Sequence, residues 1–346
     1  MNNPICFVAG GSGGHVVPCV TIAQEYRERT NAPFLFFTSD RALEHSILKN
    51  YSFIENTEKL HLKKFPSLRF WRYPSFIVSF TKSCAAAFSL LKKKRPSKII
   101  SFGGAISIPV CLSGAALGIP IEIYEFNAIP GKAVRLLSYF AQRIYICFEQ
   151  ALDKLPASKC ILTPYPVRFK TAKREALTPV ERKEHKTILV LGGSQGSAFI
   201  NSFVKNWLIE SPLAPSLHII HQTGAQHVGE LAEFYKINGL AAQVFDYDNA
   251  LDAYYHQADL VVCRAGAGSL FETLFFQKPC ITIPLENCAD NHQNANAVAL
   301  AERYPELVYV LRQSDLVTDP ELFDYALRIA LHYEGQESGL PPSVNT

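Results

Sequence analysis

The sequence predicts an α/β protein of two doubly wound domains with a cleft between them. A chain of 346 residues is long for a single core. Short continuous apolar runs alternate with helical patterns, as in parallel sheets that are covered on both faces. The pattern restarts at Lys186 after a polar segment, residues 171–185. We therefore place a linker roughly between residues 160 and 186, and the two domains at residues 1–163 and 164–346.

The apolar runs define the expected strands. In the first half of the chain we expect strands at residues 4–9, 34–38, 98–102, 121–124 and 143–147. In the second half we expect them at residues 187–191, 217–221, 243–245, 259–263, 280–283 and 307–310. Glycine, serine or threonine follows several of these runs where a helix begins. This is the carboxyl edge, at which open α/β sheets bind their ligands.

The first expected strand leads into a glycine-dense loop, residues 10–15, with the sequence GGSGGH. A helix is expected over residues 16–29, with Pro18 tolerated in its first turn. Converging backbone amides and the positive end of a helix make such a loop a cradle for an anion. His15 is the side chain type best suited to proton transfer near neutral pH. The alternatives are a plain tight turn and a structural or phosphate-contacting histidine.

The second half repeats the arrangement twice. Residues 192–197 read GGSQGS, and residues 264–269 read RAGAGS before a helix that bears Glu272. An amide-rich stretch follows at residues 290–296. Such loops would bind a diphosphate and a sugar, and a buried glutamate could accept both hydroxyls of a ribose. No glycine loop of the chain contains the Gly-Lys-Ser/Thr of a P-loop or the G-x-G-x-x-G fingerprint of dinucleotide-binding proteins, so a dehydrogenase is disfavoured. Each loop taken alone could also be a plain turn between a strand and a helix.

The net charge of +3 hides a strong asymmetry. Residues 1–160 hold 20 Lys/Arg against 10 Asp/Glu, and the rest of the chain holds 14 against 21. Residues 59–98 carry eleven Lys/Arg and no acidic residue, interleaved with aromatic side chains such as Trp71 and Phe76. This pattern suits a protein that rests on an anionic membrane surface. The aromatic residues could instead be core beneath a solvated basic face; a nucleic-acid partner is disfavoured, because no such motif accompanies the patch.

Composition excludes several other classes. The nine cysteines are odd in number, lack CxxC spacing and lie largely in apolar runs, which favours a reducing cytoplasm over a disulfide framework or a zinc site. The N-terminus has no signal-peptide pattern, and we find no stretch of the ~18 uninterrupted apolar residues of a membrane span. Residues 246–248, DYD, match a metal-binding carboxylate pair only in form, so we assign no metal site.

Five motifs together resemble those of the MurG family of bacterial cell-wall synthesis. They are GGSGGHVVP at residues 10–18, GGSQGS at 192–197, HQTG at 221–224, CRAGAGSLFE at 263–272 and DNHQNANA at 290–297. These enzymes are UDP-N-acetylglucosamine–N-acetylmuramyl-(pentapeptide) pyrophosphoryl-undecaprenol N-acetylglucosamine transferases. The similarity extends from residue 4 to about residue 312.

The resemblance implies a GT-B fold, with two Rossmann-like domains around a cleft. It implies an inverting glycosyltransferase that moves GlcNAc from UDP-GlcNAc to the undecaprenyl-diphosphate-linked MurNAc-peptide, converting lipid I to lipid II. The N-terminal domain would take this acceptor and the C-terminal domain would take UDP-GlcNAc. No cofactor would be required, and the role of a divalent metal stays open. The enzyme would be peripheral on the cytoplasmic face of the inner membrane, bound through residues 59–98, with no nucleic-acid partner.

The resemblance also implies site residues. His15 would be the general base, Glu272 would hold the ribose, Gln293 would contact the GlcNAc hydroxyls, and Asp248 would lie near the uracil. The implied donor site is Ser12, Gly13, Gly14, Asn127, Arg168, Ser194, Gln195, Asp248, Arg264, Gly266, Ser269, Glu272, Gln293 and Asn296. The implied site for the acceptor diphosphate is Gly13, Gly14, His15, Gly103, Gly104 and Asn127. We expect the catalytic loop to lie on the acceptor's side.

Three features depart from the family pattern. Tyr124 and Phe126 are aromatic where the family has polar residues, and residues 103–107 lack the usual aromatic residue and second glycine. The sequence after Glu334, GQESGLPPSVNT, lacks the expected final helix. Three alternatives remain open: a catalytically silent nucleotide-sugar-binding partner of a wall-synthesis complex, another GT-B glycolipid glycosyltransferase, and a UDP-GlcNAc 2-epimerase. The epimerase would not need a membrane patch.

Overall fold

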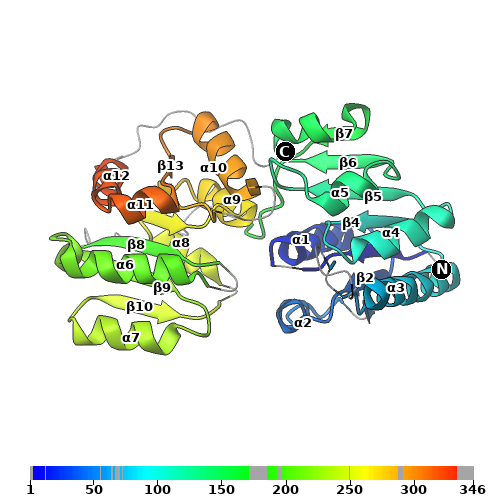
Figure 1. Ribbon diagram of the computed structural model, residues 1–346, viewed down its shortest axis with the longest axis horizontal. Coiled ribbons are helices and arrows are strands. Elements are labelled where there is room, and N and C mark those ends of the chain that lie inside the picture. Colours follow the sequence, from blue (N-terminus) through cyan, green and yellow to red (C-terminus); the bar gives the residue numbers. More distant parts are fainter. Residues whose placement is uncertain are drawn as a thin grey trace. The chain divides into compact units, whose positions relative to one another are not determined.

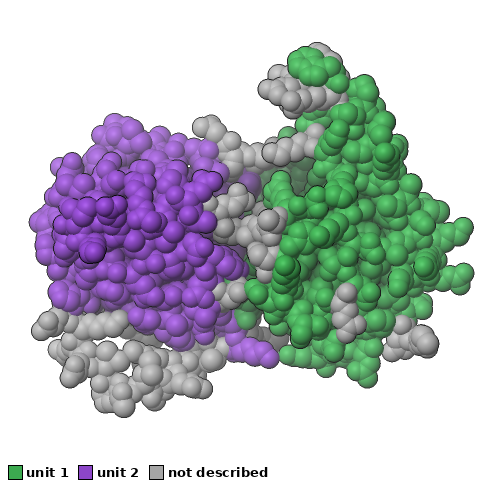
Figure 2. Space-filling model, turned by 90° about the horizontal axis from the view of Figure 1, so that it is seen from below, with its two compact units in different colours: residues 1–168 green, residues 169–346 purple. Residues whose placement is uncertain are grey.

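The computed structural model describes residues 3–11, 13–54, 56–63, 65–66, 71, 73–170, 185–193, 196–248, 250–286 and 291–332. The chain divides into two compact units, Met1–Arg168 (unit 1) and Phe169–Thr346 (unit 2), which Figure 2 shows in green and purple. The division falls after Arg168, not after residue 163 as the sequence pattern placed it. The unusual C-terminal sequence and most of the expected linker lie outside the described residues.

Unit 1 contains a seven-stranded parallel sheet in the order β3-β2-β1-β4-β5-β6-β7. Figure 1 labels β2, β4, β5, β6 and β7 of this sheet. Its strands are β1 (Ile5–Val8), β2 (Phe34–Thr38), β3 (Thr57–Lys59), β4 (Lys98–Ser101), β5 (Ile121–Glu125), β6 (Arg143–Ile146) and β7 (Cys160–Leu162). The five predicted strands are confirmed. The edge strands β3 and β7 were not predicted, because their partly exposed residues form no long apolar run. The linker was expected to begin at about residue 160, but residues 160–162 form β7 and belong to the sheet of unit 1.

The helices of unit 1 cover both faces of its sheet. They are α1 (Gly13–Arg29), α2 (Ala42–Lys49), α3 (Tyr73–Lys94), α4 (Ser107–Ala116) and α5 (Lys132–Leu137), with short 3₁₀ turns at Glu149–Lys154 and Ala157–Lys159. Alternate residues of β1 serve opposite faces. Cys6 and Val8 join the core that contains Ala87, on α3. Phe7 lies on the other face, 6.0 Å from the ring of Tyr26 on α1. Burial on both faces explains why the strands are continuous apolar runs.

Helix α3 differs from the sequence expectation. Its length and composition would allow it to cross a membrane. It was not found from the sequence, because Lys82 interrupts the continuous apolar run that was sought there. Length and composition do not separate a membrane span from a helix on a protein surface. The helix packs on unit 1 through Ser83, Ala87 and Leu91, which recur every four residues. The Ser83 hydroxyl also donates to the His61 carbonyl at 3.3 Å. We therefore treat α3 as a surface helix of unit 1.

Unit 2 contains a six-stranded parallel sheet in the order β10-β9-β8-β11-β12-β13. Its strands are β8 (Lys186–Leu191), β9 (Leu217–Gln222), β10 (Ala242–Phe245), β11 (Leu260–Cys263), β12 (Cys280–Thr282) and β13 (Val308–Val310). All six were predicted. Its helices are α6 (Ala198–Glu210), α7 (Val228–Ile237), α8 (Leu251–Gln257), α9 (Ala267–Phe275), α10 (His292–Arg303), α11 (Gln313–Thr318) and α12 (Glu321–His332), with a 3₁₀ turn at Ala214–Ser216.

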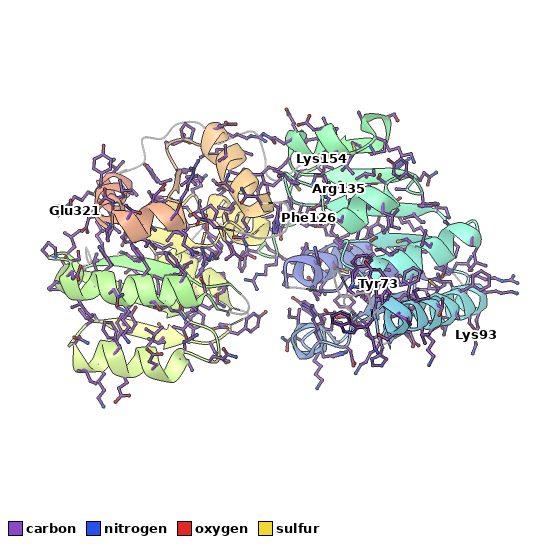
Figure 3. The ribbon with its side chains drawn as sticks, viewed as in Figure 1. Tyr73, Lys93, Phe126, Arg135, Lys154 and Glu321 are labelled. Carbon is purple, nitrogen blue, oxygen red and sulfur yellow. The ribbon has the colours of Figure 1, made fainter. Side chains whose placement is uncertain are left out.

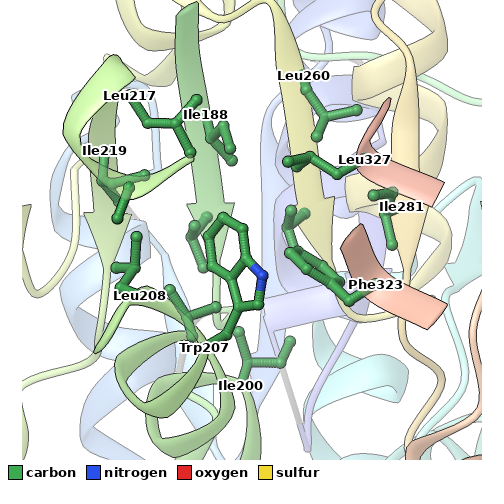
Figure 4. Close-up of a cluster of buried hydrophobic side chains, with 14 of the residues drawn as sticks. Ile188, Ile200, Trp207, Leu208, Leu217, Ile219, Leu260, Ile281, Phe323 and Leu327 are labelled. Atoms are coloured by element: carbon green, nitrogen blue, oxygen red, sulfur yellow. The ribbon is translucent and has the colours of Figure 1, made fainter. Parts of the chain in front are cut away.

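The core of unit 2 joins its sheet to the last helix, α12. Figure 4 shows Trp207 of α6 and Phe323 of α12 among the aliphatic side chains of the strands. Their ring centroids are 4.9 Å apart in an edge-to-face arrangement. The Trp207 indole N–H donates to the Asp324 carboxylate at 3.0 Å, so its polar edge is satisfied. This packing fixes α6, whose N-terminus follows one of the glycine loops.

Candidate active site

The glycine loop of unit 1 holds His15 in one orientation. The loop follows β1, and α1 begins at Gly13, so that His15 lies in the first turn of the helix. The half-buried imidazole places Nδ1 2.9 Å from the Gly10 carbonyl oxygen. Because a carbonyl oxygen can only accept, this contact requires the proton on Nδ1. The neutral ring then keeps the lone pair on Nε2, which can act as a base.

A buried carboxylate, Glu44, fixes the same loop. Glu44 lies in the first turn of α2 and is 0% exposed. It accepts hydrogen bonds from the Gly11 amide at 2.7 Å, the Ser39 amide at 2.8 Å and the Ser39 hydroxyl at 2.5 Å. The Arg41 guanidinium donates to the Gly11 carbonyl. The Gly11 amide is therefore occupied, and an anion at this loop would be held by the start of α1, at Gly13 and Gly14.

A second glycine loop follows β4 and touches the first. Gly103 and Gly104 have φ of +81° and +80°, which favours glycine. A Cβ on Gly104 would lie 2.2 Å from the Gly10 carbonyl oxygen, so no larger residue fits without moving the backbone. The His15 Nε2 atom is 3.9 Å from the position that a Cβ on Gly103 would take. The structure thus brings together Gly103, Gly104 and His15 of the implied acceptor-diphosphate site. Ser12, which was implied for the donor site, lies outside the described residues.

Asn127 belongs to a loop organised by Glu125, at the end of β5. One Glu125 carboxylate oxygen accepts from the Asn127 amide at 2.9 Å and from the Asn127 side-chain Nδ2 at 2.8 Å. The other oxygen accepts from the Gly131 amide at 2.9 Å. The loop after β5 is therefore fixed at both ends, and Glu125 determines the orientation of the Asn127 side chain.

The two aromatic departures from the family pattern are packing residues. The Tyr124 ring stacks on Tyr145 at 4.5 Å and on Phe102 at 5.2 Å. Phe126, labelled in Figure 3, is 5% exposed and meets the Tyr165 ring at 4.9 Å. Burial raises the pKa of the Tyr124 hydroxyl well above its usual range, so this group stays protonated. Both side chains thus belong to an aromatic cluster near the carboxyl ends of β4, β5 and β6.

In unit 2, Arg264 ties three segments together. Its Nε–H donates to the Ser197 hydroxyl at 3.0 Å, and Ser197 itself caps α6 through the Ile200 amide. Nη1 donates to the Ile283 and Pro284 carbonyls at 3.0 and 3.2 Å, and Nη2 donates to the Gln313 side chain at 3.2 Å. These bonds use four of its five N–H groups. Arg264 therefore shapes the loop; Ser194 and Gln195 lie outside the described residues.

Five further donor-site residues lie on or next to α9 and α10. Gly266 precedes α9, and Ser269 and Glu272 lie within it. The Glu272 carboxylate is 7% exposed and accepts from the Tyr255 hydroxyl at 3.3 Å. From α10, buried Asn296 donates to the Ala265 carbonyl at 3.2 Å. Gln293, also on α10, accepts from the Leu285 amide at 2.9 Å. One hydrogen bond thus joins α10 to the loop after β11, and another joins it to the segment after β12.

Asp248 and Arg168 lie apart from this group in the chain. Asp248 follows β10, and its two oxygens accept from the Ala250 amide at 2.8 Å and the Tyr254 hydroxyl at 3.0 Å. The Tyr254 ring stacks on Phe245 at 4.7 Å. Asp248 therefore fixes the start of α8 and a stacked aromatic pair beside it. Arg168 is the half-buried last residue of unit 1.

Sequence reasoning missed a buried network beneath the loop at residues 192–197. His221, 0% exposed, contacts the Tyr235 hydroxyl through Nδ1 at 2.9 Å and the Asn201 Oδ1 through Nε2 at 3.2 Å. Asn201 donates in turn to the Thr223 carbonyl at 2.9 Å. A Cβ on Gly196 would lie 2.3 Å from that carbonyl oxygen. The network therefore fixes the Thr223 carbonyl, against which Gly196 packs, and only the HQTG motif indicated it.

The fold and these loops define a nucleotide-sugar enzyme of the GT-B class. Residues 5–146 match the glycosyltransferase family 28 N-terminal domain, and residues 187–329 match the C-terminal domain of that family. The chain belongs to the family of UDP-N-acetylglucosamine–N-acetylmuramyl-(pentapeptide) pyrophosphoryl-undecaprenol N-acetylglucosamine transferases.

Two relatives and one solved structure illustrate the match. The transferase of this name from Desulfotalea psychrophila is 31% identical, over 96% of this chain and 89% of its own length. The one from Geobacter metallireducens is 30% identical, over 91% and 90%. The crystal structure of Acinetobacter baumannii MurG shares the fold, with a TM-score of 0.71 and 24% identity over 96% of this chain and 94% of that chain.

We expect His221 to make unit 2 sensitive to acid. Burial lowers the pKa of His221 to about 3, so the folded protein keeps it neutral while the unfolded chain protonates it below about pH 6.5. Stability is therefore lost as the pH falls below about 6.5, by up to about 1.4 kcal/mol per pH unit. Urea unfolding, followed by the fluorescence of buried Trp207, measures this loss between pH 7 and pH 5.

The matched variant is His221→Gln, which does not titrate in this range. Its free energy of unfolding should fall by roughly 2 kcal/mol less than that of the wild type between pH 7 and pH 5. Parallel pH dependence in the two proteins would show that His221 is not the titrating group.

Proposed function

We propose that this protein transfers GlcNAc from UDP-GlcNAc to the undecaprenyl-diphosphate-linked MurNAc-peptide, forming lipid II from lipid I in peptidoglycan synthesis. One observation carries the proposal: the match to transferases of this name runs through both units, at about 30% identity over about nine-tenths of the chain. Both halves of the transferase machinery are therefore represented.

The acceptor side of the proposal rests on unit 1. Its two touching glycine loops, the N-terminus of α1 and His15 meet at the carboxyl edge of the sheet. The N-terminal half of the chain also carries the positive charge excess, 20 Lys/Arg against 10 Asp/Glu in residues 1–160. A lipid-linked diphosphate fits a helix N-terminus in a basic unit. The attached sugar would then lie beside His15.

The donor side rests on unit 2. The loop at residues 192–197 precedes α6, whose N-terminus would face the UDP diphosphate. The buried Glu272 carboxylate would accept hydrogen bonds from the hydroxyls of the ribose, as acidic residues do in other nucleotide sites. Gln293 and Asn296, joined to neighbouring loops by hydrogen bonds, would present amide groups to the GlcNAc hydroxyls.

The proposed reaction is a single displacement with inversion. A hydroxyl of the acceptor sugar attacks the anomeric carbon of UDP-GlcNAc, and the bond from that carbon to the UDP oxygen breaks. His15 Nε2 accepts the proton of the attacking hydroxyl. The charge that develops on UDP is held by backbone amides and by the N-terminus of α6. Preorganised dipoles of this kind are usually the largest contribution to catalysis.

Membrane attachment is proposed through α3 and the residues before it. We call this the α3 surface and define it by five exposed apolar side chains, Phe65, Trp71, Ile77, Val78 and Phe88. Figure 3 labels Tyr73 and Lys93 near the two ends of the helix. Lys82 and Lys92–94 are exposed on it. Apolar side chains that enter the headgroup region, with cations around them, suit an anionic bilayer surface.

We expect His15→Ala to lower turnover by roughly 10²–10⁴-fold, the usual contribution of a general base. The affinity for UDP-GlcNAc should change little, because His15 is not among the residues of the implied donor site and the proposed contacts to ribose and GlcNAc lie in unit 2. Labelled UDP-GlcNAc with the undecaprenyl-diphosphate acceptor gives turnover as labelled disaccharide lipid, and calorimetry gives the affinity. Full turnover in the variant would remove the base assignment. Wild-type protein that binds the donor but forms no product would be a silent nucleotide-sugar-binding protein.

Glu272→Ala should weaken donor binding by roughly tenfold or more, since a hydrogen bond to a charged group contributes about 1.5–3 kcal/mol. Calorimetric titration with UDP measures the affinity directly. The control is Glu230→Ala, which removes an exposed carboxylate of α7 that pairs with Lys205 at 2.9 Å. Equal affinities for UDP in the two variants would argue against Glu272 as the ribose ligand.

The α3 surface predicts a selective loss of membrane binding. Replacing both Ile77 and Val78, which are 55% and 52% exposed, with serine should weaken binding to phosphatidylglycerol vesicles by roughly tenfold. Vesicle co-sedimentation measures the change. Ile237→Ser is the matched control, because Ile237 is 74% exposed on α7 of unit 2. Loss of binding only in the control would place the membrane surface elsewhere.

A further inference from the structure

One peptide group connects the proposed base to a buried carboxylate. The Gly10 carbonyl and the Gly11 amide belong to the same planar, trans peptide, so they point in opposite directions. The carbonyl oxygen contacts His15 Nδ1 at 2.9 Å, and the amide donates to Glu44 at 2.7 Å. The carboxylate and the imidazole are therefore joined through a single rigid group.

We propose that Glu44 is a positioning residue that orients His15 through the Gly10–Gly11 peptide. The inference rests on the proposed role of His15 as the base. In this arrangement Glu44 holds the peptide plane, and the peptide carbonyl holds the proton of the imidazole on Nδ1. The lone pair then stays on Nε2, beside Gly103, where the acceptor hydroxyl must give up its proton.

The surroundings of Glu44 suit this role. A carboxylate only accepts, and each of its three partners here, the Gly11 amide and the amide and hydroxyl of Ser39, can donate. A peptide whose N–H binds an anion is polarised, so its carbonyl becomes a better acceptor for the imidazole N–H. Arg41 holds the next carbonyl, that of Gly11. Gly104 packs against the Gly10 carbonyl and resists its rotation.

Glutamine at position 44 would keep the shape and break the pattern. One of the two carboxylate oxygens becomes an NH₂ group, which must face either the Gly11 amide or the Ser39 amide. With the NH₂ group toward Gly11, two donors face each other and the Gly10–Gly11 peptide is released. With the NH₂ group toward Ser39, the Ser39 amide loses its acceptor, and a neutral amide oxygen holds the Gly11 amide less strongly than a carboxylate does. In both cases the Gly10 carbonyl is held less firmly, and the imidazole distributes its proton over both nitrogens.

The experiment reads the imidazole of His15 directly. Two-bond ¹H–¹⁵N NMR of ¹⁵N-histidine-labelled, substrate-free protein separates the tautomers, and the signal lost in His15→Ala assigns His15. The wild type should show the Nδ1–H form alone, and Glu44→Gln should show a mixture. In the transfer assay, Glu44→Gln should lower kcat by roughly 10- to 100-fold, as small misplacements of catalytic groups do, with the KM for UDP-GlcNAc unchanged.

Two further variants keep the test decisive. Glu122→Gln also removes a buried carboxylate of unit 1, one that pairs with Lys98 at 2.9 Å, and it should leave the His15 tautomer and the kcat unchanged. Should Glu44→Gln not fold, Glu44→Asp keeps the charge and shortens the reach, and the same mixture is expected.

The outcomes separate the inference from the function on which it rests. A folded Glu44 variant with the Nδ1–H form alone and normal kcat overturns the inference. An equal change of the His15 tautomer in Glu122→Gln also overturns it, because the effect would then be one of general stability. Wild-type protein without transferase activity overturns the proposed function, while the NMR measurement still decides whether Glu44 orients His15.

Discussion

Both units depend on one constraint of parallel sheets. Each strand must be followed by a connection that returns along a face of the sheet, so all strands end at the same edge. The segments that leave this edge carry backbone groups that no strand can pair. In this protein the loops after β1, β2 and β5 of unit 1, and after β8, β9, β11 and β12 of unit 2, contain Gly11, Ser39, Asn127, Ser197, Thr223, Arg264 and Ile283, whose polar contacts help to position the proposed sites.

The two units hold those loops with different sets of side chains. In unit 1, Glu44 and Glu125 accept from backbone amides of the loops, which leaves the carbonyl of Gly10 for His15. In unit 2, Arg264 and Asn296 donate to backbone carbonyls. The Gly192 amide of unit 2 donates to the Gln222 carbonyl at 3.1 Å. In the proposed chemistry unit 1 orients a base, and unit 2 shapes the loops that would bind a diphosphate.

The sequence predicted most of this fold, because strands buried on both faces appear as continuous apolar runs such as residues 187–191. It did not predict β3 or β7, whose residues at the sheet edges are partly exposed. Glycine loops and His15 were visible as local motifs. Glu44 was not, because its partner Gly11 is 33 residues away in the chain and nothing in the sequence around Glu44 marks the contact. His221 was visible only as part of a motif whose function depends on Asn201 and Tyr235, both distant in sequence.

Tyr124 and Phe126 lie at and just after the end of β5, where the family resemblance implied polar side chains. Both rings are used in packing, and the Asn127 side chain donates to Glu125. Backbone groups of the two glycine loops lie beside His15, whose Nδ1 contacts the Gly10 carbonyl at 2.9 Å. Backbone groups survive substitution of neighbouring side chains as long as glycine keeps the close approach at Gly104. Under the proposed function, in which unit 1 takes the acceptor, recognition should therefore depend more on the path of the backbone than on the identity of residues 124–126.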